Sequence, residues 1–310
     1  MDIYFASQCV KELNSYFEEN NLNLLYSQYN DRAYINKYSN MIKEGSFKGK
    51  LMIDSGAYSA FKSGAEVDAD DYISYLNELD GNYTVAIQLD KIPGKFGETK
   101  TVADINEASK QSIANFNYMV GKLKHFKKLM PVFHQHESFD VLNYYLNYRF
   151  SDGSKIEYIG LSPAKDTGLP QRENFLAKCY NIIFKSSNKD IKTHLLGVFS
   201  LPSLMMFPCT SSDATSWKLS AGYGSIITEL GIINISSTQK DRKGNFNTLP
   251  MSQKTIIINR TKKYGISIDD LVNDTKARYL FNVKYMVEAT SKIASANVGS
   301  YKTQNTLFGV

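Results

Sequence analysis

Residues 51–58 read LMIDSGAY, an apolar run that ends abruptly in an aspartate, a serine and a glycine. A short apolar run bounded by polar and glycine residues is typical of a strand that is buried on both faces. The same form recurs along the chain, with stretches of helical periodicity in between. The eight predicted strands are residues 3–6, 51–54, 84–90, 129–134, 158–161, 194–199, 208–213 and 225–235.

The intervening segments carry the spacing of amphipathic helices. The predicted helices are residues 68–79, 102–126, 138–148 and 172–185. Alternating strands and helices indicate parallel βαβ construction, and eight strands favour a (β/α)8 barrel over a doubly wound sheet. No GxxxxGK or GxGxxG sequence follows a predicted strand, so a nucleotide-binding doubly wound fold has no support here. We therefore predict the α/β class, with a TIM-type barrel over residues 1–237.

A basic, helical C-terminal extension is predicted after the barrel, over residues 238–310, either as part of the same domain or packed on it. Its expected parts are a polar loop at 238–250, a short strand at 255–259, one or two helices at 268–294 and a frayed polar tail at 297–310. The basic residues of its first part are Lys240, Arg242, Lys243, Lys254, Arg260, Lys262 and Lys263, against the single acid Asp241. Such a cluster indicates either phosphate contacts or a solvated charged face.

The composition is that of a soluble globular chain, with 43% hydrophobic and 22% charged residues and a net charge of +5. No apolar run is long enough for a membrane span, and the N-terminus lacks the apolar stretch of a signal peptide. A cytoplasmic protein without a membrane partner is therefore expected. Cys9, Cys179 and Cys209 form no CxxC pair, which predicts reduced, buried thiols and no zinc site.

Three carboxylates follow predicted strands, namely Asp54, Asp90 and Asp213. In a parallel barrel the carboxyl ends of the strands form one mouth, where active sites are built. Each aspartate alone could simply cap the next helix. Together they could divide the labour of glycosyl exchange, one attacking the glycosidic carbon and another moving a proton.

The residues around these strand ends form six short motifs. They are Asp54-Ser55-Gly56-Ala57-Tyr58, Leu89-Asp90, Val132-Phe133-His134-Gln135, Ile159-Gly160-Leu161, His194-Leu195-Leu196-Gly197-Val198 and Ser212-Asp213-Ala214-Thr215-Ser216-Trp217. In this order and spacing, over roughly residues 50–220, they resemble the motifs of the tRNA-guanine transglycosylases.

The resemblance implies a barrel enzyme that exchanges guanine in a polynucleotide for a 7-deazaguanine without cleaving the backbone. It implies that Asp213 attacks C1′ of the target nucleoside and forms a covalent intermediate, and that Asp54 is the general acid/base. The base-binding residues implied are Tyr58, Asp90, Gln135, Gly160, Leu161, Leu196 and Gly197. A target base would have to leave the helical stack to reach such a pocket.

The chain departs from the tRNA enzymes in having no cysteine after Cys209, so their C-terminal zinc site is absent and no cofactor is expected. In this it resembles the compact, zinc-free, DNA-modifying DpdA-like branch of bacteria and phages. DNA is therefore the preferred polymer, tRNA the alternative, and a free 7-deazaguanine such as preQ0 the donor; a partner protein stays open. The phosphate-contacting residues would be Lys240, Arg242, Lys243, Arg260, Lys262 and Lys263.

Two other functions remain open. The first is a metal-dependent barrel hydrolase that uses His134 and His136, for which His194, at the start of its predicted strand, is the only further histidine nearby. The second is a catalytically silent nucleic-acid-binding barrel that keeps the pocket without turnover. In either case Trp217, the only tryptophan, is expected at the pocket rim.

Overall fold

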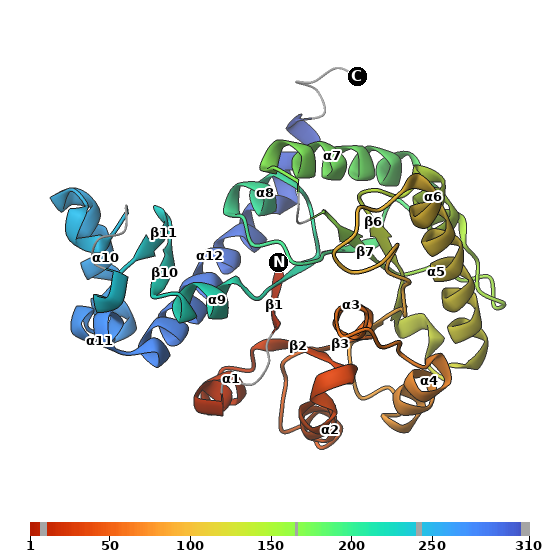
Figure 1. The fold of residues 1–310 in the computed structure, drawn as a ribbon, viewed down its shortest axis with the longest axis horizontal. Coiled ribbons are helices and arrows are strands. Elements are labelled where there is room, and N and C mark those ends of the chain that lie inside the picture. The colour runs from red at the N-terminus through yellow and green to blue at the C-terminus, as the bar shows by residue number, and fades with distance from the viewer. Residues whose placement is uncertain (7–10, 165–166, 240–243, 305–310) are drawn as a thin grey trace. The chain divides into compact units, whose positions relative to one another are not determined.

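The computed structural model describes residues 1–6, 11–164, 167–239 and 244–304 (Figure 1). The chain divides into two compact units. The sheet unit comprises Tyr4–Gln8 and Tyr16–Asp213, and the C-terminal unit comprises Met1–Ile3, Cys9–Ser15 and Ala214–Val310. The division falls after Asp213, whereas the sequence predicted one after residue 237. No helix among the described residues is long and apolar enough to cross a membrane.

A nine-stranded parallel sheet, curled into a nearly closed barrel, dominates the described part of the chain. Its strands are β1 (Asp2–Ala6), β2 (Asn23–Ser27), β3 (Leu51–Asp54), β4 (Val85–Ile87), β5 (Leu129–Met130), β6 (Val132–His134), β7 (Tyr158–Ser162), β8 (Lys192–Leu195) and β9 (Ser211–Ala214). Their order in the sheet is β5-β4-β3-β2-β1-β9-β8-β7-β6. Successive strands are thus neighbours, except β5 and β6, which are the two ends of the order.

The two ends of the sheet, β5 and β6, are separated in sequence by Pro131 alone. The carbonyl of Met130 accepts a hydrogen bond from Gln88, which follows β4, while the carbonyl of Pro131 accepts one from Gly160 of β7. Residues 129–134 therefore carry the hydrogen-bonded sheet from β4 across to β7. Because proline has no N–H to donate, the ladder is interrupted at this residue.

Helices follow most strands and lie outside the sheet, as Figure 1 shows for α2, α4, α5, α6 and α7. The helices of this part are α1 (Asn14–Glu19), α2 (Gln28–Lys43), α3 (Ala57–Lys62), α4 (Ala69–Glu78), α5 (Val102–Lys122), α6 (Phe139–Asn147), α7 (Leu169–Lys185) and α8 (Leu201–Met206). Local sequence sets where several of them begin. Asp68 and Ser138 cap α4 and α6, and Thr101 forms a capping box with Asp104 at the start of α5. The four helices predicted from the sequence are confirmed to within four residues at each end.

Buried apolar side chains fill the sheet unit. One cluster consists of Tyr4, Met52, Val85, Ile87, Met130, Val132 and Tyr158, with Leu25 and Leu196 packed against it. These residues come from β1–β7 and from the end of β8, and pairs such as Val85 and Ile87 are two positions apart, the period at which strand residues share a face. The cluster therefore forms the core inside the barrel, not the layer between the sheet and the surrounding helices.

Two strand predictions were wrong in the region of the sheet. Strand β2 was missed, because its apolar run, Leu24 to Tyr26, is only three residues long and follows an asparagine-rich stretch. Residues 225–235, predicted as a barrel strand, instead form an antiparallel hairpin of β10 (Ser225–Thr228) and β11 (Gly231–Asn234), a separate two-stranded sheet. Gly231 at φ +97° lies in the tight turn.

The C-terminal unit is helical beyond this hairpin. It contains α9 (Ser216–Gly222), α10 (Met251–Tyr264), α11 (Ile268–Asn273) and α12 (Thr275–Gln304). The strand predicted at 255–259 was wrong, because Ile257, Thr261 and Tyr264 are buried at helical spacing on one face of α10. Where the sequence predicted one or two helices, α11 and α12 lie, and α12 continues into the expected tail as far as Gln304.

Candidate active site at the carboxyl ends of the strands

Asp54 is the last residue of β3, and the turn after it is tightly built. Its carboxylate accepts a hydrogen bond of 3.0 Å from the N–H of Gly56. Gly56 has φ +81°, and a Cβ there would collide with the Tyr29 side chain and lie 2.8 Å from the Ser27 hydroxyl. Only glycine fits this turn without strain. The Asp-Ser-Gly sequence therefore fixes the Asp54 carboxylate at the end of its strand while α3 begins at Ala57.

The environment of Asp54 favours its neutral form. Burial raises the pKa of the Asp54 carboxyl to about 7, and the negative charges of Asp90 and, more weakly, Asp213 act in the same direction. The hydrogen bond from Gly56 opposes this shift and is outweighed. Because β3, β4 and β9 belong to one parallel sheet, the three carboxylates lie toward the same end of that sheet.

Asp90 follows β4 by three residues and pairs with a histidine. Its Oδ2 lies 2.8 Å from Nε2 of His134, the last residue of β6. Burial alone would lower the pKa of His134, but the hydrogen bond and charge of Asp90, with the charge of Glu137, raise it overall. Glu137 also accepts hydrogen bonds from the His134 N–H and the Ser109 hydroxyl. Asp90 therefore already has one partner, and the sequence did not predict this.

Asp213 lies in β9 and is 7% exposed. Its Oδ1 accepts a hydrogen bond of 2.7 Å from the N–H of Gly197 and lies 3.2 Å from Nε2 of His194. Gly197, predicted as a base-binding residue, therefore contacts the proposed nucleophile directly. Donors that converge on one carboxylate oxygen stabilise its negative charge.

His194 is a candidate site residue that the sequence placed at the start of its strand. Its predicted strand began at residue 194, whereas β8 spans Lys192–Leu195 and pairs His194 with Ser211 of β9. The polar sequence of Lys192 and Thr193 concealed the start of the strand. His194 is fully buried, and its two ring nitrogens contact Ser211 and Asp213.

Gln135 ties two loops together at the mouth of the barrel. Its Oε1 accepts a hydrogen bond of 2.8 Å from the N–H of Ala164, and its own N–H donates to the carbonyl of Ser162. The amide nitrogen of Gln135 is the end of this side chain that could donate to a carbonyl of a bound base.

The backbone groups of Gly160 and Leu161 form hydrogen bonds within the sheet. The N–H of Gly160 donates to Pro131, and the carbonyl of Leu161 accepts from the N–H of Leu196. A Cβ on Gly160 would lie 2.9 Å from Cδ1 of Leu196 and 3.2 Å from Cγ2 of Val132. The glycine thus makes room for Leu196 in the barrel filling, which is a structural reason for the Gly-Leu sequence.

A cavity of about 200 Å³ opens beside Asp90. Its lining includes Phe61, Val67, Leu89, Asp90, Ile92 and Asn115. Tyr58, predicted to stack on the base, is 55% exposed on α3 and is not part of this lining. The lining is mixed, because it also includes Glu66, Lys91 and Gln111, and neither Asp54 nor Asp213 is part of it.

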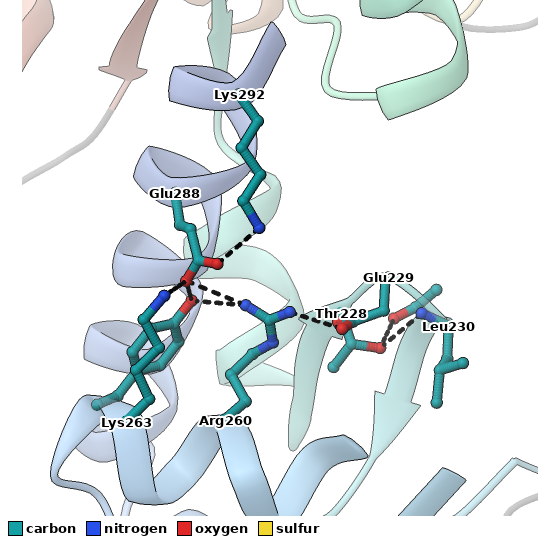
Figure 2. A network of polar contacts seen from close by, with 9 residues as sticks. Thr228, Glu229, Leu230, Arg260, Lys263, Glu288 and Lys292 are labelled. Carbon is teal, nitrogen blue, oxygen red and sulfur yellow. Dashed lines mark hydrogen bonds and ion pairs between the residues drawn. The ribbon is translucent and has the colours of Figure 1, made fainter.

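The predicted polynucleotide-binding residues differ in exposure and in their ion-pair partners. Lys240, Arg242 and Lys243 lie outside the described residues. Arg260 is only 15% exposed and pairs with Glu229 at 2.6 Å and with Glu288 at 3.2 Å, as Figure 2 shows. Lys263 also pairs with Glu288, at 2.9 Å, and Lys262 is exposed. Arg260 is thus a structural ion-pair residue of the C-terminal unit.

Trp217 does not lie at a pocket rim, which corrects that prediction. Its side chain is fully buried in the C-terminal unit and meets Tyr279 edge to face, with ring centroids 5.8 Å apart. Its carbonyl accepts a hydrogen bond from Asn282. Trp217 is therefore a core residue that joins α9 to α12.

The histidines considered for a metal site have other contacts. His134 pairs with Asp90, His194 lies within the barrel, and His136 is exposed. Among the residues described, no group of three or more His, Cys, Asp or Glu side chains is placed to hold a metal ion. Cys179 and Cys209 are buried free thiols, whereas Cys9 lies outside the described range.

Comparison with known proteins does not place the chain in a family. No protein-family model matches its sequence, and no curated protein matches it either.

Proposed function

We propose that the protein is a base-exchange transglycosylase that acts on a polynucleotide. The observation that carries the proposal is the convergence of Asp54, Asp90 and Asp213 at the carboxyl ends of three strands, with the pKa of Asp54 raised to about 7. Glycosyl transfer of this kind needs two carboxyl groups, one as nucleophile and one to carry a proton. Six ordered motifs that resemble the tRNA-guanine transglycosylases support the same reaction.

In the proposed reaction an oxygen of Asp213 bonds to C1′ of the target nucleoside while the bond from C1′ to the guanine nitrogen breaks. Asp54, in its protonated form, gives its proton to the leaving guanine nitrogen. The Asp54 carboxylate then removes a proton from the incoming base, whose nitrogen bonds to C1′ and displaces Asp213 as the free carboxylate. A group with a pKa near 7 can both give and take a proton at neutral pH, which suits Asp54 to this role.

Asp90 is the proposed reader of the donor edge of the base, and it lines a cavity of about 200 Å³. Gln135 is proposed to read the carbonyl edge. Tyr58 and Leu196 would stack on the ring, which is a contact that does not depend on base identity.

The finer aspects of the proposal concern architecture and substrate. Counting β5 and β6 as one strand interrupted at Pro131 gives eight strands, so the fold is proposed as a (β/α)8 barrel. DNA is the proposed polymer, with tRNA as the alternative, and a free 7-deazaguanine is the proposed donor. Neither a zinc site nor another cofactor is part of the proposal.

Base exchange can be measured directly with labelled guanine and, separately, duplex DNA, single-stranded DNA and bulk tRNA. We expect label to enter one polymer. Asp213→Ala should lower this incorporation at least about a thousandfold, because the covalent intermediate of the proposed reaction forms on its carboxylate. Asp54→Asn should slow it by about two to four orders of magnitude, the range for a lost general acid/base. The exposed Asp190→Asn is the control.

Undiminished incorporation by Asp213→Ala would remove Asp213 as the nucleophile. Binding of a polymer without any label incorporation, by the native protein and with guanine and 7-deazaguanine donors alike, would favour the silent binding barrel instead.

A further inference from the structure

A continuous line of polar groups crosses the inside of the barrel from β7 to β9. The hydroxyl of Tyr158 lies 2.5 Å from the Ser211 hydroxyl, and Ser211 lies 2.6 Å from Nδ1 of His194. Nε2 of His194 lies 3.2 Å from Oδ1 of Asp213. These four residues are called the His194 network below. Tyr4 and Tyr158 pack edge to face on the imidazole and fix its plane.

The donors and acceptors of the His194 network are consistent with one arrangement of protons. A tyrosine hydroxyl can donate to Ser211, and the serine hydroxyl can then donate to Nδ1 of His194. An imidazole that accepts at Nδ1 carries its proton on Nε2, from which it donates to Asp213. Because Gly197 donates to the same Oδ1, both hydrogen bonds act on one oxygen of the carboxylate.

The network has a serine, a histidine and an aspartate, yet its burial does not fit a serine nucleophile. Ser211 and His194 are both 0% exposed, so neither reaches a substrate. The Asp213 side chain is 10% exposed and is the only member of this trio with any access to solvent. A reacting group must be accessible, so of the serine, the histidine and the aspartate only Asp213 can be the reacting group.

We propose that His194 is a positioning residue: its Nε2–H, together with the N–H of Gly197, holds Oδ1 of Asp213 and so directs Oδ2 toward the substrate carbon. The proposal rests on Asp213 being the nucleophile of the proposed function. A nucleophilic carboxylate must approach C1′ in a narrow range of directions, and two fixed donors on one oxygen restrict its rotation.

The proton on His194 can be located without any substrate. In the ¹⁵N-histidine-labelled protein, the ring couplings distinguish a proton on Nε2 from one on Nδ1, and with four histidines in the chain His194→Gln assigns the signal. We expect Nε2–H, and a shifted resonance in Asp213→Asn. A ring protonated on Nδ1 alone, or one that does not respond to Asp213→Asn, would overturn the proposal.

The kinetic test compares His194→Ala with His194→Gln. His194→Ala should lower kcat for exchange by about ten- to a hundredfold, as loss of an orienting hydrogen bond does, and leave KM for the base nearly unchanged. His194→Gln offers an amide N–H near the position of Nε2 and should restore most of kcat. Equal losses in both variants, with both folded by circular dichroism, would show that His194 only fills space.

The proposed function and the positioning role of His194 can be disproved independently. If the native protein exchanges no base in any polymer, the transglycosylase function falls, while the proton position on His194 still decides whether Asp213 is held as described. Tyr180→Phe is the matched control, because its buried hydroxyl lies 2.8 Å from the Thr193 hydroxyl and outside the His194 network, and its kcat should change less than about threefold.

Discussion

At the scale of the residue, Asp54 carries the clearest electrostatic consequence. Its folded pKa of about 7 lies above the ordinary value of 3.8, so the folded state holds a proton that the unfolded state has released. As pH rises between these two values, this group lowers the free energy of unfolding.

Asp54→Asn removes that effect, so its stability relative to the native protein should increase from about pH 5 to about pH 8. The pKa difference sets an upper limit of about 3 kcal/mol for this increase. Urea unfolding of both proteins at the two pH values measures it, with the exposed Asp190→Asn as the control. A stability difference that does not change with pH would mean that Asp54 ionises normally in the folded protein.

At the scale of the element, the close contact of β7 with the end of β8 depends on Gly160. Gly160→Ala places a methyl group 2.9 Å from Leu196 and 3.2 Å from Val132. Overpacking of this kind costs about 1–3 kcal/mol in the free energy of unfolding, which urea titration will show.

Gly121→Ala in α5 is the matched control, because nothing lies within 4 Å of a Cβ there. That variant should be neutral or more stable by up to about 1 kcal/mol, since alanine favours a helix. Combining Gly160→Ala with Leu196→Ala should cost less than the sum of the two changes, because the methyl group then has space. Strict additivity would contradict the contact.

At the scale of the whole molecule, the positive charge of the C-terminal unit is partly neutralised within the fold. Burial alone would raise the pKa of Glu288, but hydrogen bonds from Lys263, Lys292 and Tyr264, and the charge of Arg260, lower it to about 2. Glu288 is therefore ionised at neutral pH and offsets part of the basic cluster. The basic cluster counted in the sequence therefore has less positive charge available to bind a phosphate backbone than the count suggests.

Arg260→Ala and Lys262→Ala should consequently separate stability from polymer binding. Arg260→Ala leaves Glu229 and Glu288 without their shared partner and should lower the free energy of unfolding by about 1–3 kcal/mol. Lys262→Ala should change it by less than about 0.5 kcal/mol, yet reduce the salt dependence of DNA binding by about one phosphate contact. Fluorescence anisotropy at several salt concentrations measures the latter. A stable Arg260→Ala variant with weakened DNA binding would reverse this assignment.

Much of the fold was predictable because its signals are local. Apolar runs such as residues 51–54 and 158–161, and caps such as Thr101, depend only on neighbours in sequence. Strand β2 and the helical state of residues 255–259 were not predictable. The polar residues of β2 favour a loop, and the β-branched residues at 255–259 favour a strand. In both segments, burial against other elements outweighs the local preference.

The sequence by itself determined the alternation of strands and helices, and it placed Asp54, Asp90 and Asp213 at strand ends. Only the tertiary structure decided that Asp54 has a pKa near 7, that Asp90 pairs with His134, and that His194 contacts Asp213. The physical reason is that burial and charge act through space. Groups 19 to 44 positions apart in sequence come within hydrogen-bond distance only when the parallel strands align their carboxyl ends.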